Sequence, residues 1–269
     1  MDFKKFQKII SKNKRNKELV NKKLKEFYNE ANMENEDDLL DIMQIARTVI
    51  SKNGYLIAKI PFKDIEIGAI CFSGDGSKYV LLNSALPRVN VNFSLCHEIY
   101  HVLYQYHSFK ESVELYMNEN YYDHEEEMIA NHFAASLMMP ESKFIKMFNK
   151  FEQESEGNES ELQVIVKLMN YFTAPYIAVL IRCYELELFK DGDSLKRLLN
   201  IDREQISDEF DMLWLNTELL KAPKNDDFEK LLELVNKKGE YLVSRELMRK
   251  TELERIKNNM KRLYQEIRG

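Results

Sequence analysis

The residues with the clearest chemical potential are two histidines and a glutamate in the pentad His97-Glu98-Ile99-Tyr100-His101. On a helix, side chains four residues apart share a face, so the imidazoles of His97 and His101 can reach one metal ion. Glu98 then lies beside that ion, where a general base for an activated water belongs. The pentad therefore predicts a hydrolytic zinc site, with His97 and His101 as metal ligands and Glu98 as the catalytic residue.

A third protein ligand is required, because a pentad of this kind also arises by chance and hydrolytic zinc sites usually have three protein ligands. A second helical pattern begins at His124, 23 residues after His101, which is far enough for the chain to turn back. Glu127 and Asn131 share one face of it, as a ligand and an orienting polar partner would. The alternative is that Glu125 to Glu127 only form an acidic helix start, which the helix dipole favours.

The elements that must position these residues follow from the periodicity of apolar side chains. Apolar residues at helical spacing predict helices over 1–30 and 36–52, and a change of period predicts short strands over 55–60, 66–72 and 78–83. The rest of the chain indicates helices only: 90–106, 124–138, 141–151, 160–171, 174–188, 193–199, 203–219, 226–238 and 242–267. The predicted fold class is α+β and predominantly helical, with a small β-sheet.

The composition of the chain argues against several classes of protein function. The chain has 269 residues, of which 44% are hydrophobic and 31% are charged, and its net charge is −6. These values are ordinary for a globular protein and do not indicate a general nucleic-acid coat. Three widely spaced cysteines make no disulfide framework, and neither a secretory signal nor an apolar run long enough for a membrane span is present. We expect a cytoplasmic protein that does not enter a membrane.

The phrases NFSLCHEIYH (92–101) and EMIANHFAASLMMP (127–140) resemble the ImmA/IrrE family of zinc metallopeptidases. The resemblance covers about residues 36–188. It implies a zincin-like core in which His97, His101 and Glu127 bind Zn²⁺ and Glu98 is catalytic. Two departures concern the substrate rather than the metal: Asn90 and Asn92 lie where the family commonly has Arg, and Tyr100 replaces a frequent Gly.

The resemblance also implies a partner. Family members often cleave a helix-turn-helix repressor, which derepresses mobile-element or stress genes, or act in toxin-antitoxin-like pairs. Residues 160–188 resemble the helix-turn-helix-like segment of the family, with Thr173 as N-cap and Pro175 in the first turn of the second helix. That helix is very apolar, so we favour a packing role, and direct nucleic-acid binding stays open.

Composition breaks divide the chain into a zincin-like core with N-terminal helices (1–152), a helix-turn-helix-like segment (153–200) and a C-terminal helical region (201–269). We expect the apolar stripe of the last helix to pack on the core.

Strand 78–83 precedes the active helix, so it could be an edge strand that pairs with substrate, or simply a buried strand. The oxyanion donor stays open among nearby side chains: Tyr100, Tyr104, His107, Tyr121, Tyr122, His124 and His132.

The sequence thus predicts a zinc-dependent endopeptidase that hydrolyses a peptide bond with metal-activated water, in regulatory cleavage of a partner protein. Two alternatives come from other classes: a non-catalytic zinc-binding regulator, and a toxin-type interaction module. The presence of Glu98 argues against the first, because a structural metal site has no use for that carboxylate.

Overall fold

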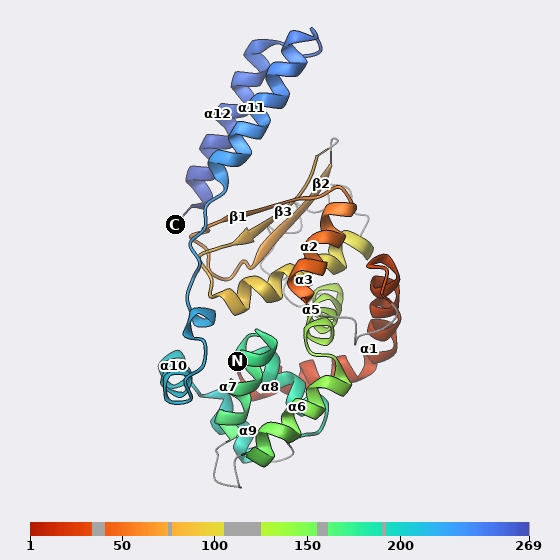
Figure 1. Cartoon of the computed structure of the whole chain (residues 1–269), viewed down its shortest axis with the longest axis vertical. Coiled ribbons are helices and arrows are strands. Elements are labelled where there is room, and N and C mark those ends of the chain that lie inside the picture. The colour runs from red at the N-terminus through yellow and green to blue at the C-terminus, as the bar shows by residue number, and fades with distance from the viewer. Residues whose placement is uncertain (34–40, 75–76, 105–124, 155–160, 190–191, 269) are drawn as a thin grey trace.

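The computed structural model describes residues 1–33, 41–74, 77–104, 125–154, 161–189 and 192–268. A small sheet lies between a body of helices and a projecting two-helix arm (Figure 1). This arrangement confirms the predicted α+β, predominantly helical fold. The elements in chain order are α1 (Phe3–Glu30), α2 (Ile42–Lys52), β1 (Leu56–Ile60), β2 (Ala69–Gly74), β3 (Ser77–Asn83), α3 (Arg88–Tyr104), α5 (Glu125–Met138), α6 (Glu141–Glu154), α7 (Glu161–Phe172), α8 (Tyr176–Glu185), α9 (Gly192–Leu199), α10 (Arg203–Met212), the 3₁₀ helix η3 (Thr217–Leu220), α11 (Phe228–Ser244) and α12 (Lys250–Ile267).

The sheet has the order β1-β3-β2, with β1 parallel and β2 antiparallel to the central strand β3. Val80 of β3 pairs with Ile57 on one side and with Cys71 on the other. The prediction that strand 78–83 is an edge strand open to substrate is therefore wrong. Both edges of β3 are occupied, and the short β2 is the antiparallel edge strand.

The two outer edges of the sheet differ. On β1, the backbone N–H of Lys59 donates to the Asp227 carboxylate at 2.9 Å, and the Lys59 carbonyl accepts from the Asp227 N–H at 2.8 Å. Just beyond β1, the N–H of Lys63 donates to the carbonyl of Ile267. Among the described residues, β2 has no strand partner other than β3. The edge of β2 is thus the one left for a further strand.

Asn83 fixes the junction between the sheet and the helix that follows. Its side chain is fully buried and makes four hydrogen bonds to backbone groups. Its amide nitrogen donates to the carbonyls of Asp64 and Ile67, and its oxygen accepts from the N–H groups of Phe62 and Ala85. One side chain therefore ties the loop between β1 and β2 to the start of the segment that leads into α3.

Helix α3 is the centre of the body, with residues buried on nearly all of its faces: Val89, Val91, Leu95, Cys96, Glu98, Ile99, Tyr100, His101 and Val102. It packs against α5, α2 and the sheet. A helix that is buried on nearly all of its faces belongs to the core. Helix α1 closes the far side of α5, where Phe27 and Phe133 pack edge to face and the Tyr104 hydroxyl donates to the carbonyl of Lys23.

The helix-turn-helix-like segment corresponds to α7 and α8, which are bent by 110° at their junction. Thr173 does not cap α8 as predicted. It has a positive φ of 51° after α7, and Pro175 occupies the N-cap position of α8. Every residue of α8 is buried or half-buried, and its one arginine, Arg182, is 3% exposed. This helix therefore presents no face that could enter a DNA groove, which agrees with the packing role.

The last helices differ from the sequence expectation at two points. The predicted helix 203–219 ends at Met212, because Trp214 has a left-handed φ of 54°, and it resumes only as η3. The predicted helix 242–267 starts at Lys250, so α11 and α12 form a hairpin, the arm.

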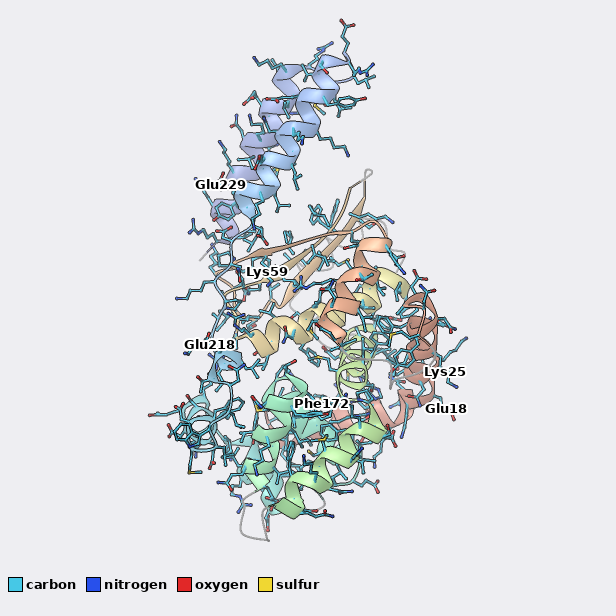
Figure 2. The ribbon with its side chains drawn as sticks, viewed as in Figure 1. Glu18, Lys25, Lys59, Phe172, Glu218 and Glu229 are labelled. Carbon is cyan, nitrogen blue, oxygen red and sulfur yellow. The ribbon has the colours of Figure 1, made fainter. Side chains whose placement is uncertain are left out.

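The expectation that the last helix packs on the core is wrong. The main hydrophobic core runs from Phe6 to Leu220 and includes no residue of the arm. In the arm, α12 packs instead on α11, where Tyr264 stacks on Phe228. Glu229, at the base of the arm, lies above Lys59 of the sheet (Figure 2). The main core crosses residue 152, and the three-part division of the chain stays a prediction.

Among the described residues, no single helix is long and apolar enough to cross a membrane. Helices α7 and α8 meet the length and composition only as a bent pair.

Candidate metal centre

Two imidazoles meet on one face of α3. His97 and His101 lie one turn apart, and their Nε2 atoms are 2.8 Å from each other. The His97 side chain is 13% exposed and that of His101 is 9% exposed, so both are nearly withdrawn from solvent. Helical spacing alone brings these two nitrogens together, as the sequence predicts.

Glu127 reaches the same point from the first turn of α5. Its Oε2 lies 3.1 Å from Nε2 of His97, and its Oε1 lies 3.5 Å from Nε2 of His101. The potential ligand atoms of the three residues all lie within 4.8 Å of one another. Glu127 is 28% exposed, so the group is open to solvent on this side.

Asn131 orients one of the imidazoles. It lies one turn after Glu127 on α5, and its Oδ1 is 3.0 Å from Nδ1 of His97. An amide oxygen only accepts, so Nδ1 of His97 must carry the proton and donate. The lone pair of His97 is then on Nε2, directed at His101 and Glu127. This is the tautomer that a metal ligand needs.

Glu98 lies behind the ligand pair and is 4% exposed. Its Oε2 is buried and has no hydrogen-bond partner among the described residues. Burial raises the pKa of Glu98 to about 7; the neighbouring His101 lowers the pKa and the charge of Glu127 raises it. A carboxyl group that titrates near neutrality can both take up and release a proton under working conditions.

The donor set fits a zinc ion. Two imidazole nitrogens and one carboxylate oxygen converge, and the hydrogen bond to Asn131 fixes the tautomer of His97. This is a ligand set of catalytic zinc sites, in which a fourth position stays open. The unpartnered oxygen of Glu98 adds a buried acceptor with no structural use. Zinc binding and the roles of the four residues stay predictions.

Three oxyanion-donor candidates are engaged elsewhere. The Tyr100 hydroxyl donates to Glu126 at 3.0 Å, and the Tyr104 hydroxyl donates to the Lys23 carbonyl. His132 is buried and bonded to Glu185. The remaining candidates lie outside the described residues: His107, Tyr121, Tyr122 and His124.

Edge strand β2 lies beside the active helix, which the sequence analysis missed. A Cβ on Gly68, just before β2, would lie 2.3 Å from Oγ of Ser94 on α3, so a side chain at this position would force Ser94 to move. On β2 itself, burial and then the charge of Glu98 raise the pKa of Cys71. The effect of Glu98 places this thiol within electrostatic range of the candidate base. The only sequence signal for this close approach was a glycine followed by a strand, and that pattern is too common to identify a site.

Comparison with known proteins gives one result. Residues 50–184 match the peptidase M78 family, described as the IrrE N-terminal-like domain. The matched span includes the sheet, α3, α5 and the α7–α8 pair. No curated protein and no solved structure matches the chain significantly.

Proposed function

Because the chain belongs to the peptidase M78 family and is thereby a metallopeptidase, we propose that it is a zinc-dependent endopeptidase that cleaves a partner protein. The observation that carries the proposal is the convergence of His97, His101 and Glu127 beside the buried Glu98. Neither helix packing nor surface solvation needs four such groups in one place.

In this proposal, His97, His101 and Glu127 hold the cation. When bound there, zinc would supply Lewis-acid activation of a water molecule and of the scissile carbonyl. Glu98 takes up the proton that the attacking water loses and passes it to the departing amine nitrogen. Its raised pKa suits both transfers, because the proton is neither held too tightly nor lost at once. Asn131 keeps His97 in the ligand tautomer throughout.

An extended substrate segment would pair with β2. The edge of β1 is taken by Asp227 and β3 is central, so within the described parts of the chain β2 is the edge with room for another strand. Strand β2 also packs against α3, the helix that carries His97, Glu98 and His101. A peptide added along β2 would therefore run beside the reacting groups, held by main-chain hydrogen bonds.

The substrate class rests on the resemblance to the ImmA/IrrE family. We infer a helix-turn-helix repressor or an antitoxin as the cleaved partner, in the cytoplasm. The burial of α8 supports a division of labour in which the repressor contacts DNA and this chain does not. The competing hypothesis is a zinc-binding regulator or toxin-type module that binds its partner without cleaving it.

The variant Glu98→Gln separates these functions. It keeps the size of the side chain and removes the base, so the variant should bind zinc like the wild type and lose cleavage. The measurement is N-terminal labelling and mass spectrometry of a lysate of the source cells treated with zinc-loaded protein. Glu125→Gln, at an exposed carboxylate two residues from Glu127, is the control and should cleave normally. New N-termini that persist with Glu98→Gln would show that catalysis does not depend on this site.

A further inference from the structure

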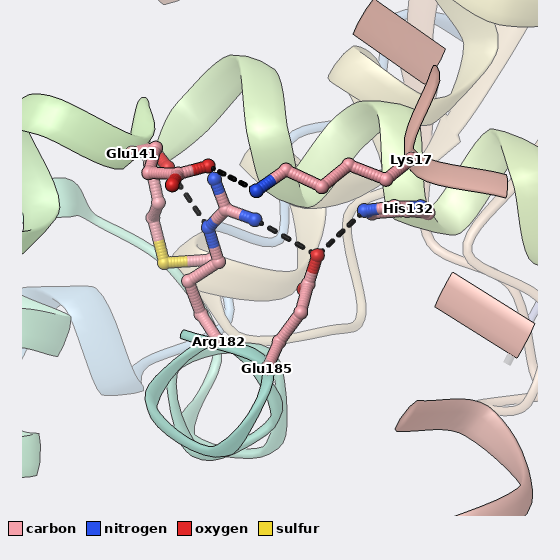
Figure 3. Close-up of polar contacts among 6 residues, drawn as sticks. Lys17, His132, Glu141, Arg182 and Glu185 are labelled. Atoms are coloured by element: carbon pink, nitrogen blue, oxygen red, sulfur yellow. Dashed lines mark hydrogen bonds and ion pairs between the residues drawn. The ribbon is translucent and has the colours of Figure 1, made fainter. Parts of the chain in front are cut away.

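A second polar cluster lies between α5 and α8 (Figure 3). Nε2 of His132, on α5, lies 2.7 Å from Oε1 of Glu185, on α8. The same oxygen accepts a hydrogen bond at 3.0 Å from Arg182, one turn earlier on α8. All three residues are at most 8% exposed. We call them the α5–α8 network.

The network holds α5 at two points. Glu185 bonds to His132 in the middle of the helix, while Nε of Arg182 donates to the carbonyl of Met139, just past its end. Seven residues of helix separate these points, a distance of about 10 Å along the axis. Two fixed points on one rigid helix define both its rotation and its position along its own axis.

Stability alone does not explain the network. Nδ1 of His132 and Oε2 of Glu185 are buried and find no hydrogen-bond partner among the residues that the structure describes. Buried ionic groups that are only partly satisfied are often no better for stability than apolar side chains of the same volume. Their best-attested advantage is to select one register out of several. The helix held in register here is the one that carries Glu127 and Asn131.

We propose that His132, Glu185 and Arg182 position α5 so that Glu127 and Asn131 meet the histidines of α3. His132 lies one residue after Asn131 and five after Glu127, about 140° around the helix from the ligand. A rotation or slide at His132 is passed through the helix to both groups. Metal ligands tolerate displacements of only about 0.5 Å, so a small loss of register weakens the site. This role rests on the proposed metal centre.

An exposed ion pair, also drawn in Figure 3, can be compared with the buried α5–α8 network. Lys17 of α1 and Glu141 of α6 form an ion pair of 2.8 Å beside the network, and both side chains are 44% exposed. An exposed ion pair of this kind contributes little to stability, because water and salt screen the attraction between its charges. It is close to the network in Figure 3, but it joins α1 to α6 rather than α5 to α8.

The test is the zinc affinity of purified full-length variants, from competition with a chromophoric chelator, together with the visible spectrum of the cobalt-loaded protein. His132→Ala should bind zinc about 10-fold more weakly, as loss of a ligand-orienting contact typically does, and should alter the cobalt spectrum. His132→Gln keeps an N–H that can reach Glu185, so it should restore most of the affinity. Glu141→Gln should match the wild type.

Two results would overturn the positioning role. One is a folded His132→Ala with a zinc affinity within twofold of the wild type and an unchanged cobalt spectrum. The other is failure of both His132 variants to fold at 10 °C, which would make the network a structural requirement only. A wild type that binds no zinc would instead remove the proposed metal centre, so the two failures are distinguishable.

Discussion

At the level of single residues, the metal centre depends on which nitrogen of His97 carries its proton. Asn131 settles this by accepting from Nδ1 at 3.0 Å, which leaves Nε2 free to bind a cation. The protonation state of Glu98 depends on a different effect. Its pKa is raised because burial disfavours the charged carboxylate, although His101 opposes the shift. The oxygen of Asn131 thus sets the tautomer of His97, and burial tunes the pKa of Glu98 towards neutrality.

The role of Asn131 can be tested by changing the acceptor. Asn131→Leu has no acceptor for Nδ1 of His97, so zinc affinity should fall 10- to 100-fold, about the usual effect of losing such a contact. Asn131→Asp keeps an acceptor and should retain most of the affinity. The measurement is competition with a chromophoric chelator at pH 7. Equal affinities for the Leu variant and the wild type would show that Asn131 does not orient the ligand.

Glu185 predicts an acid dependence of stability. Burial would raise its pKa, but the hydrogen bond with His132 and the charge of Arg182 outweigh burial, so the pKa is lowered. A lowered pKa stabilises the fold above the unfolded value of about 4.3, and this contribution is lost as the pH falls through the folded pKa. The free energy of unfolding of Glu185→Gln, from urea titrations between about pH 5 and pH 3, should therefore fall less steeply than that of the wild type. Parallel slopes would contradict the account.

At the level of elements, the hydrogen bonds of one side chain, Asn83, hold the sheet against the segment that leads into α3. Asn83 bonds to four backbone groups around the end of β3 and is fully buried. These bonds hold the loop that begins β2 against the segment leading into α3. The edge strand and the active helix are thereby kept in one arrangement.

Asn83→Leu should consequently be strongly destabilising. It removes the partner of two backbone N–H groups and two carbonyls at a buried to part-buried junction, at a cost of about 3 kcal/mol in the free energy of unfolding. Asn200→Leu is a suitable control, because Asn200 is exposed and its side chain makes one local bond, to the Lys196 carbonyl. That change should stay within about 0.5 kcal/mol. Urea unfolding measures both, and similar values for the two variants would contradict the role of Asn83.

The elements also show which features were predictable. Regular apolar spacing located the three strands and most helices of the body within a few residues, but it missed helix ends in the C-terminal region by seven and eight residues. Four-residue spacing placed His97 beside His101. Strand order was not predictable, because the period of β3 is the same in a central strand and in an edge strand. The break at Trp214 was hidden, since an aromatic residue gives no signal for a left-handed φ. The contact between His132 and Glu185 spans 53 residues of chain, beyond any local pattern.

At the level of the whole molecule, the arm is attached to the sheet but separate from the core that holds the site. Gly239 of α11 packs directly against Leu253 of α12. A Cβ there would lie 2.1 Å from Cδ1 of Leu253, whose side chain is 3% exposed. The two helices can therefore pack only if this position lacks a side chain.

Gly239→Val should loosen the arm and leave the metal centre unchanged. Amide hydrogen exchange should speed up in residues 228–268, because the helices are forced apart, while zinc affinity stays within twofold of the wild type. Gly192→Val is the control, because a Cβ at Gly192 meets nothing within 4 Å. Weaker zinc binding in Gly239→Val alone would show that the arm supports the site after all.

The central claim is that α3 and α5 together form one zinc site, and metal content tests it most directly. The measurement is inductively coupled plasma mass spectrometry of the purified wild type, Glu127→Ala and Glu125→Ala. The account predicts about one zinc per chain in the wild type and in Glu125→Ala, whose carboxylate is exposed, and a large loss in Glu127→Ala. Zinc that is absent from the wild type, or retained in full by Glu127→Ala, would contradict it.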